Sequence, residues 1–293
     1  MLAPLAAVIA LLGAWSAYWF VASTLAQNYA AGARQQFAAR GLSLACASED
    51  WGGYPFRFEF SCKQPLFNLP GGQLLRSGSL FAVAQAYDPT HVVALIDGPG
   101  ALTLPGGVTY DITHDRATLS VDASRDGTFH IAAEIPNFAG ANLFVAKDIQ
   151  LHTRPAKDQA NDIAITLENA SYNSPGKPPL LVDHAQLLAN LADNHEIAIT
   201  DLQFTQGTLK LWGKGTVGLD AAHRIAGRIA SQTNDLNQLL TVLDPHIKAS
   251  EQKRATLKAF LGLLGQQAKA DFVAQDGDLF IGPLKIGVLL PLY

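Results

Sequence analysis

Charged residues are scarce in this sequence, and basic residues do not outnumber acidic ones. Only 16% of the 293 residues are charged, with 21 Lys or Arg against 25 Asp or Glu. Proteins that bind nucleic acid need basic side chains gathered on one face to neutralise phosphates. The composition therefore argues against a nucleic-acid partner.

Cysteine and methionine are also rare, whereas glycine and proline are frequent. The chain has 2 Cys and 1 Met but 25 Gly and 15 Pro. This balance is more typical of an exported, turn-rich protein than of a helical enzyme of the cytosol. Because 48% of the residues are hydrophobic, the chain has enough apolar surface for a folded core, and we do not expect disorder.

The motifs of several large enzyme classes are missing. The sequence contains no G-x-S-x-G elbow, no H-E-x-x-H pair and no phosphate-binding loop. Several His residues stand directly beside an acidic residue, and neighbours in a strand point to opposite faces. These pairs are His114 with Asp115, His184 with Asp183, and His195 with Glu196. We therefore expect no catalytic residues, no metal site and no cofactor, in a protein that is not an enzyme.

The N-terminal region is an apolar stretch with no charged side chain before Arg34. The run from Leu5 to Ala22 is about long enough to cross a bilayer, and aromatic residues near its outer end suit a membrane interface, namely Trp15, Tyr18 and Trp19. We predict a transmembrane anchor over residues 1–25 and a helical extension over 26–40, with Gly41 as the helix cap. A cleavable signal peptide is the alternative, but it requires a shorter apolar core.

From Gly41 onward, apolar residues alternate with other residues as in a β-strand. Leu42, Leu44 and Cys46 share one face of a first strand, and Cys62 shares a face with the Phe residues at 56, 58 and 60 in a second. If the two strands form a hairpin with Cys46 opposite Cys62, the turn centres on residue 54. Facing cysteines lie within reach of a disulfide, which would place this region outside the cytoplasm.

The predicted turn contains the residues Trp51, Gly52, Gly53, Tyr54 and Pro55. Glycine allows the positive φ angles of tight turns, and proline fixes its own φ. The cysteine spacing does not match a C-x-x-C redox pair, and a zinc site would need further ligands. A structural role is favoured, with a ligand platform formed by Trp51 and Tyr54 as the alternative.

The rest of residues 41–293 is predicted to form a β-rich periplasmic domain. Short segments rich in β-forming residues are separated by Gly, Pro, Asn or Asp, which indicates an antiparallel meander. Two long arms, "HEIAITDLQFTQGTLKLWGKGTVGLD" and "HRIAGRIASQ", meet near residues 220–223, and the glycines at 213, 215 and 218 suggest bulges or curvature. The Pro-rich segment at 173–180 is the best candidate for a domain boundary.

Apolar residues recur at helical spacing in three places. In "NDLNQLLTVLDP" the leucines at 236, 239, 240 and 243 share one face, with Asn234 or Asp235 as the cap and Pro245 as the stop. Residues 250–265 repeat this spacing, and residues 183–193, with Asp183 as the cap, form a weaker third candidate. The predicted fold class is α+β and β-dominated, with a long antiparallel meandering curved sheet, two or three short amphipathic helices and an N-terminal transmembrane helix.

Three segments resemble a known bacterial family. "DWGGYPFRFEFSC", "AQAYDP" and "DGDLFIGPLKIGVLLPL" are similar to the uncharacterised family called domain of unknown function 2125, over nearly the whole chain after the anchor. The resemblance implies an envelope-associated protein of alphaproteobacterial type with one N-terminal membrane segment and no established catalytic residues. More loosely, the chain is similar to AsmA-like envelope proteins, whose curved sheets are thought to hold lipid.

These observations predict a single-pass protein of the bacterial inner membrane with its C-terminal domain in the periplasm. An anchor followed by a long sheet without reactive groups favours a non-catalytic role, such as binding lipid or another apolar component of the envelope. The alternative is a structural or assembly factor that docks another envelope protein through a sheet edge or turn.

Overall fold

The computed structural model describes residues 2–124, 128–156, 161–191, 196–245, 269–282 and 284–289, together with residues 252, 255 and 259. The chain divides into two compact units, Met1–Ala133 and Glu134–Tyr293. The division falls inside strand β11 (Phe129–Gly140). The Pro-rich segment at 173–180 lies within the second unit, where it joins two paired strands.

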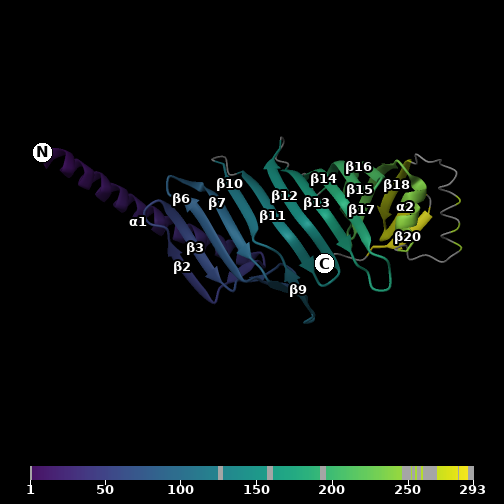
Figure 1. The fold of residues 1–293 in the computed structure, drawn as a ribbon, viewed down its shortest axis with the longest axis horizontal. Helices are drawn as coiled ribbons and strands as arrows, with labels where there is room; N and C mark the ends of the chain where they lie inside the picture. Colours follow the sequence, from purple (N-terminus) through teal and green to yellow (C-terminus); the bar gives the residue numbers. More distant parts are fainter. Residues whose placement is uncertain are drawn as a thin grey trace. The chain divides into compact units, whose positions relative to one another are not determined.

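The first unit begins with a long helix, α1 (Leu2–Ala39) (Figure 1). It is long and apolar enough to cross a membrane, with a mean hydropathy of 1.9 over its best 18-residue window. Gly41 adopts a φ of +81°, and the Leu42 amide donates to the Phe37 carbonyl at 2.9 Å. This geometry is the predicted glycine cap, because a left-handed residue lets the chain turn back onto the last carbonyls.

Ten strands follow α1 in the first unit before β11. They are β1 (Ser43–Ala45), β2 (Ser48–Gly52), β3 (Arg57–Lys63), β4 (Leu66–Asn68), β5 (Leu74–Arg76), β6 (Ser79–Gln85), β7 (Asp88–Asp97), β8 (Gly100–Thr103), β9 (Thr109–Thr113) and β10 (Ala117–Ala123). All pairings described here are antiparallel. One set runs in the order β2, β3, β6, β7, β10, and the other in the order β1, β4, β5, β8, β9.

The two sets are halves of the same five long arms. Each strand of one set is joined along the chain to the strand at the same position in the order of the other set, and the two together form one arm. The short interruptions between the two strands of each arm line up in one row across the sheet. We call this row the crease, and it comprises residues 46–47, 64–65, 77–78, 98–99 and 114–116. Pro65 and Pro99 have no amide hydrogen for a sheet ladder, which helps to explain why pairing stops there.

Glycine at the crease allows neighbouring backbones to approach closely. A Cβ added to Gly98 would lie 2.6 Å from the carbonyl oxygen of His114, and one added to Gly78 would lie 2.9 Å from the carbonyl oxygen of Gly98. Real Cβ atoms do not come that close to a backbone oxygen. The crease therefore requires glycine at these positions.

The core of the first unit lies on one face of the arms. Phe60, Cys62, Leu80 and Ala94 are buried together, and side chains from both sides of the crease pack on them, including Leu44 and Phe67. Along β3, Phe58, Phe60 and Cys62 are buried while the residues between them are not. The predicted alternation is confirmed for Phe58, Phe60 and Cys62, but not for Phe56, which precedes the strand and is 62% exposed.

The second unit is an antiparallel meander. It contains β12 (Phe144–Pro155), β13 (Asn161–Tyr172), β14 (Leu180–Leu191), β15 (Ile197–Gln206), β16 (Leu209–Leu219), β17 (Ile225–Thr233), β18 (Lys269–Gln275), β19 (Asp278–Ile281) and β20 (Leu284–Val288). Each of these strands pairs with the next one in sequence. The predicted arms joined near residues 220–223 are β16 and β17, and the pairing of β15 with β16 shifts register opposite Gly213 and Gly215.

One predicted short helix is confirmed, and another is wrong. Helix α2 (Leu236–Leu243) is capped by Asp235, whose carboxylate accepts a bond from the Gln238 amide at 3.0 Å. Residues 183–191 do not form the predicted helix, because they belong to β14, and residues 184–191 are paired on both sides. The remaining two residues of that prediction, 192 and 193, lie outside the described residues. The third prediction, over residues 250–265, lies outside the continuous described ranges. Within the described chain, the helices with defined bounds are α1 and α2, so only one short amphipathic helix is confirmed.

Candidate functional site

The predicted disulfide between Cys46 and Cys62 is present, with its two Cα atoms 5.4 Å apart. The predicted register is wrong, because Cys62 lies opposite Glu49 rather than Cys46. Cys46 sits at the crease, where the first arm is interrupted, and the amide of the next residue, Ala47, bonds to the Lys63 carbonyl at 2.9 Å. The pairing keeps one register on both sides of this interruption, with Ala45 opposite Leu66 and Glu49 opposite Cys62. Cys46 lies before Glu49 in the first arm, so the bridge runs diagonally instead of between facing residues.

The predicted turn is also displaced toward the C-terminus. Trp51 and Gly52 belong to β2, and Trp51 stacks beside Phe60 with ring centres 5.0 Å apart. The chain reverses over residues 53–56, where the Arg57 amide bonds to the Gly53 carbonyl at 2.9 Å. Trp51 and Tyr54 therefore do not form a common platform: Trp51 joins the core, and Tyr54 lies at the turn.

Helix α1 is hydrogen-bonded to this turn and its neighbour through the aromatic side chains that are predicted from the sequence to lie at a membrane interface. Trp15 Nε1 donates to the Pro55 carbonyl at 2.9 Å, and Trp19 Nε1 donates to the Arg57 carbonyl at 2.9 Å. Tyr18 Oη donates to the Ala86 carbonyl at 2.6 Å in the neighbouring turn between β6 and β7. These polar atoms are thus satisfied by the protein backbone.

Ring packing adds to these hydrogen bonds. Trp19 is only 7% exposed and is buried together with Phe58 and Ala86. Its ring lies edge-on to Tyr54, with ring centres 5.3 Å apart. Farther along α1, Arg34 pairs with Glu49 at 3.0 Å and lies over the ring of Phe60. One side of α1 is therefore fixed to β2 and β3 over several turns.

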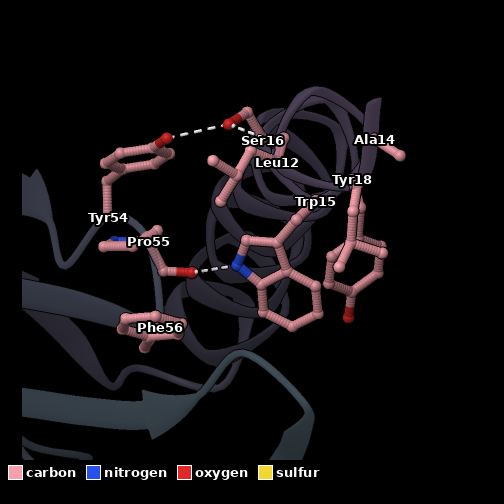
Figure 2. A pocket seen from close by; sticks show the side chains of 9 residues that line it. Leu12, Ala14, Trp15, Ser16, Tyr18, Tyr54, Pro55 and Phe56 are labelled. Carbon is pink, nitrogen blue, oxygen red and sulfur yellow. Dashed lines mark hydrogen bonds between the residues drawn. The ribbon is translucent and has the colours of Figure 1, made fainter. Parts of the chain in front are cut away.

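An open pocket of about 470 Å³ lies between α1 and the turn. Figure 2 shows the turn residues Tyr54, Pro55 and Phe56 on one side and Leu12 and Trp15 of the helix on the other. The hydroxyls of Ser16 and Tyr54 share a hydrogen bond of 2.8 Å at its rim. The lining residues are Leu11, Leu12, Ala14, Trp15, Ser16, Tyr18, Tyr54, Pro55 and Phe56. Most of these side chains are apolar, which suits an apolar ligand better than a polar substrate.

The second unit carries a continuous apolar face across β12–β16. The pairing registers place apolar side chains next to one another in two rows across these strands. The rows are Ile149, Leu167, Ala185, Phe204 and Leu211, and Leu151, Ile165, Leu187, Leu202 and Gly213. We call these two rows the apolar face. Apart from the buried Gly213, its residues are all partly exposed to solvent.

The opposite face of the same strands is polar. One row contains Asp148, Glu168, His184, Thr205 and Lys210, and the next contains Gln150, Thr166, Gln186, Gln203 and Trp212. A solvated face of this kind is usual for an antiparallel sheet whose other face is covered. The contrast therefore indicates that the apolar face is the one expected to be shielded from water by another molecule or segment.

The polar face holds one histidine and carboxylate pair that the sequence did not indicate. His184 Nδ1 lies 2.7 Å from Glu168 Oε1, across the pairing of β13 and β14. No group of three or more His, Cys, Asp or Glu residues placed to bind a metal was found in the described part of the chain. Of the adjacent pairs in the sequence, those at His114 and His184 are not part of such a group, and His195 lies outside the described residues.

Hydrogen bonds lower the pKa of three Asp carboxyl groups. The Arg116 side chain, and then the Ser79 hydroxyl, lowers the pKa of Asp97. The Asn190 amide, followed by Arg154, lowers the pKa of Asp162, and the backbone amide of Arg224 and then its side chain do the same for Asp220. All three groups hold strands or turns together, which indicates structural roles.

A comparison with protein families gives one match. The profile of the family described as an uncharacterized protein conserved in bacteria, domain of unknown function 2125, matches residues 19–289. The chain belongs to this family. No curated protein and no solved structure matches the chain.

The family match includes most of the parts described above, but not the helix residues Leu11 to Tyr18 that line the pocket. It begins at Trp19 and covers the turn at 53–56, the crease and the apolar face. Two of the segments that resemble the family, "DWGGYPFRFEFSC" and "AQAYDP", lie side by side next to α1. There the Ala86 amide donates to the Phe56 carbonyl at 2.8 Å. Two family segments far apart in sequence thus form one structural feature.

Proposed function

We propose that the protein is anchored in the bacterial inner membrane by α1, and that its β-rich part lies in the periplasm. There it binds lipid, or another apolar component of the envelope, on the apolar face of the second unit. In this proposal the protein holds its ligand and does not catalyse a reaction. The observation that carries the proposal is the apolar face, which lies on the same strands as a mostly polar one.

The anchoring part of the proposal is supported by α1. Its hydropathy and length meet the requirement for a membrane span, and side chains on its outer sides are exposed apolar groups, such as Leu11, Phe20 and Val21. The periplasmic side is supported by the bond between Cys46 and Cys62, because disulfides are rarely retained in the cytoplasm.

The binding part is supported by the chemistry and size of the apolar face. A row across five neighbouring strands is about 20 Å long, which accommodates an extended acyl chain. Each methylene group removed from water on such a surface contributes about 0.8 kcal/mol. Exposed apolar patches of this kind mark binding surfaces in soluble domains. A polar ligand would gain little there.

Lipid analysis of purified protein tests the proposal. The full chain is extracted from membranes in a mild detergent, and the bound material is measured by native mass spectrometry. We expect bound lipid on the wild-type protein and several-fold less on Leu187→Glu. The matched control is Gln186→Glu, which introduces the same side chain at the preceding position of β14, on the polar face.

Two results would contradict the proposal. One is a wild-type protein without lipid whose apolar face is shielded from solvent. The other is an equal amount of lipid on both variants, which would place the lipid elsewhere. A stoichiometric protein that copurifies with the wild type and is lost from Leu187→Glu would instead favour the assembly-factor alternative.

A further inference from the structure

We propose that the turn beside α1 is inserted into the membrane interface. We call this surface the aromatic tip, and it comprises Tyr54, Pro55 and Phe56 of the β2–β3 turn and Tyr87 of the β6–β7 turn. Its partner is the lipid bilayer that α1 crosses, in the part of the acyl chains that lies within about 10 Å of the headgroups. The inference rests on the proposed anchoring but concerns a different surface from the apolar face.

The position of the hydrogen bonds along α1 sets the depth of the tip. The apolar segment from Leu5 to Ala22 rises about 27 Å as a helix, close to the hydrocarbon thickness of about 30 Å. The span therefore needs nearly the whole segment, including Trp15 and Trp19. Trp19 lies about 5 Å and Trp15 about 10 Å inside the outer end of this segment. Since these two residues bond to the carbonyls of Pro55 and Arg57, the turn lies in the outer half of the span, below the headgroups.

The side chains at the tip suit this depth. Phe56 is 62% exposed, Tyr54 is 54% exposed and Tyr87 is 73% exposed. Large aromatic residues are preferred at the level of the lipid headgroups, where the ring is covered and a hydroxyl stays hydrated. In water alone, this cluster would leave a patch of apolar surface without a cover.

The backbone carbonyls at the tip are hydrogen-bonded within the protein, as an apolar environment requires. An unpaired carbonyl in hydrocarbon costs several kcal/mol. The carbonyls of Pro55, Arg57 and Ala86 accept bonds from α1, and the Phe56 carbonyl accepts one from the Ala86 amide. Non-helical backbone is tolerated at membrane depth when its polar groups are satisfied in this way.

The pocket between α1 and the turn gives lipid a place to bind. It is lined mainly by apolar groups and lies between the helix residues Leu11 to Tyr18 and the tip (Figure 2). At the proposed depth, an acyl chain would fill it. Charged residues flank the tip, with Arg57 and Asp88 both exposed, as expected for groups that remain in the headgroup layer.

Quenching of tryptophan fluorescence by brominated lipids tests the depth. The full chain is reconstituted in nanodiscs of phosphatidylethanolamine and phosphatidylglycerol, with bromine near the top of the acyl chains. The test variant is Phe56→Trp. The control is Val108→Trp, which is 53% exposed in the β8–β9 turn, on the other side of the crease. Emission of the wild-type protein is subtracted from both, and disulfide formation is checked in both.

We expect the tryptophan added at position 56 to lose most of its emission in brominated nanodiscs, and the one at position 108 to lose almost none. If the wild-type Trp15 and Trp19 are quenched but the added residue at 56 is not, α1 spans the bilayer and the tip inference is wrong. If the wild-type protein is not quenched at all, the anchoring proposal fails as well. Blue-shifted emission at position 56 without quenching would show a protein cover instead of lipid, and would also overturn the inference.

Discussion

Asp97 connects three of the five arms at the crease. Its carboxylate accepts a bond from Ser79 at 2.7 Å and one from Arg116 at 2.8 Å. Its carbonyl accepts bonds from the Ser77 hydroxyl and the Gly78 amide. This residue of β7 therefore connects the two neighbouring arms on either side of it at the crease.

The stability of the first unit should depend on the ionisation of Asp97. Because the Arg116 bond lowers its pKa in the folded protein, the ionised form contributes stability at pH values above the usual Asp pKa of about 3.9. This contribution is lost as the pH falls through the lower, folded-state pKa. Asp97→Asn should lower the free energy of unfolding at neutral pH by about 1 kcal/mol or less, since the ion pair is partly exposed.

Denaturant unfolding in detergent over a series of pH values measures this effect. The difference between wild type and Asp97→Asn should shrink in acid and at high salt. The control is Asp50→Asn, which changes an exposed carboxylate of β2. A difference that persists unchanged at low pH would show that the carboxylate charge is not responsible.

At the scale of single residues, the sequence predicted the cysteine bridge but not the partners of the aromatic residues in α1. The bridge was predictable because both cysteines are in phase with apolar neighbours in short, adjacent segments. The Trp15, Tyr18 and Trp19 side chains instead bond to carbonyls 38 to 68 residues away. Any residue has a carbonyl, so no residue type in the sequence marks these acceptors.

At the scale of elements, the crease depends on glycines that approach the backbone of the next arm. Gly98→Ala should lower the free energy of unfolding by about 1–3 kcal/mol, because the new methyl group would overlap with the His114 carbonyl. Gly52→Ala is the control, since no heavy atom lies within 4 Å of the added Cβ. Thermal unfolding of the two variants in detergent compares them, and equal stability would contradict the close approach.

Strand β14 shows why element type was predicted incorrectly in one place. Residues 183–193 are rich in Ala and Leu, which favour a helix, and the leucines are spaced to suit one. In the fold, residues 183–191 are paired with β13 on one side and β15 on the other, and this pairing outweighs local propensity. The alternation of Gln186 and Leu187 between the two faces becomes evident only when the neighbouring strands are known.

At the scale of the whole molecule, the sequence predicted a β-dominated chain with an apolar N-terminal helix, and this is confirmed. It did not predict the apolar face, because that surface is assembled from five strands through their registers. Beyond its two rows, a bulge in β15 between residues 199 and 202 places Ile199 beside Ala189 of β14 and Gly215 of β16. The glycines at 213 and 215 indicated a bulge in this region, but not that it lies in the neighbouring strand, β15.

The most direct test of lipid binding uses photocrosslinking in living cells. A photoreactive amino acid is placed in the full chain at position 187, on the apolar face, or at position 186, on the polar face. After illumination, we predict lipid adducts at position 187 and none at position 186, as measured by mass spectrometry of the purified protein. The absence of a lipid adduct at position 187, or the same adducts at both positions, would contradict the account.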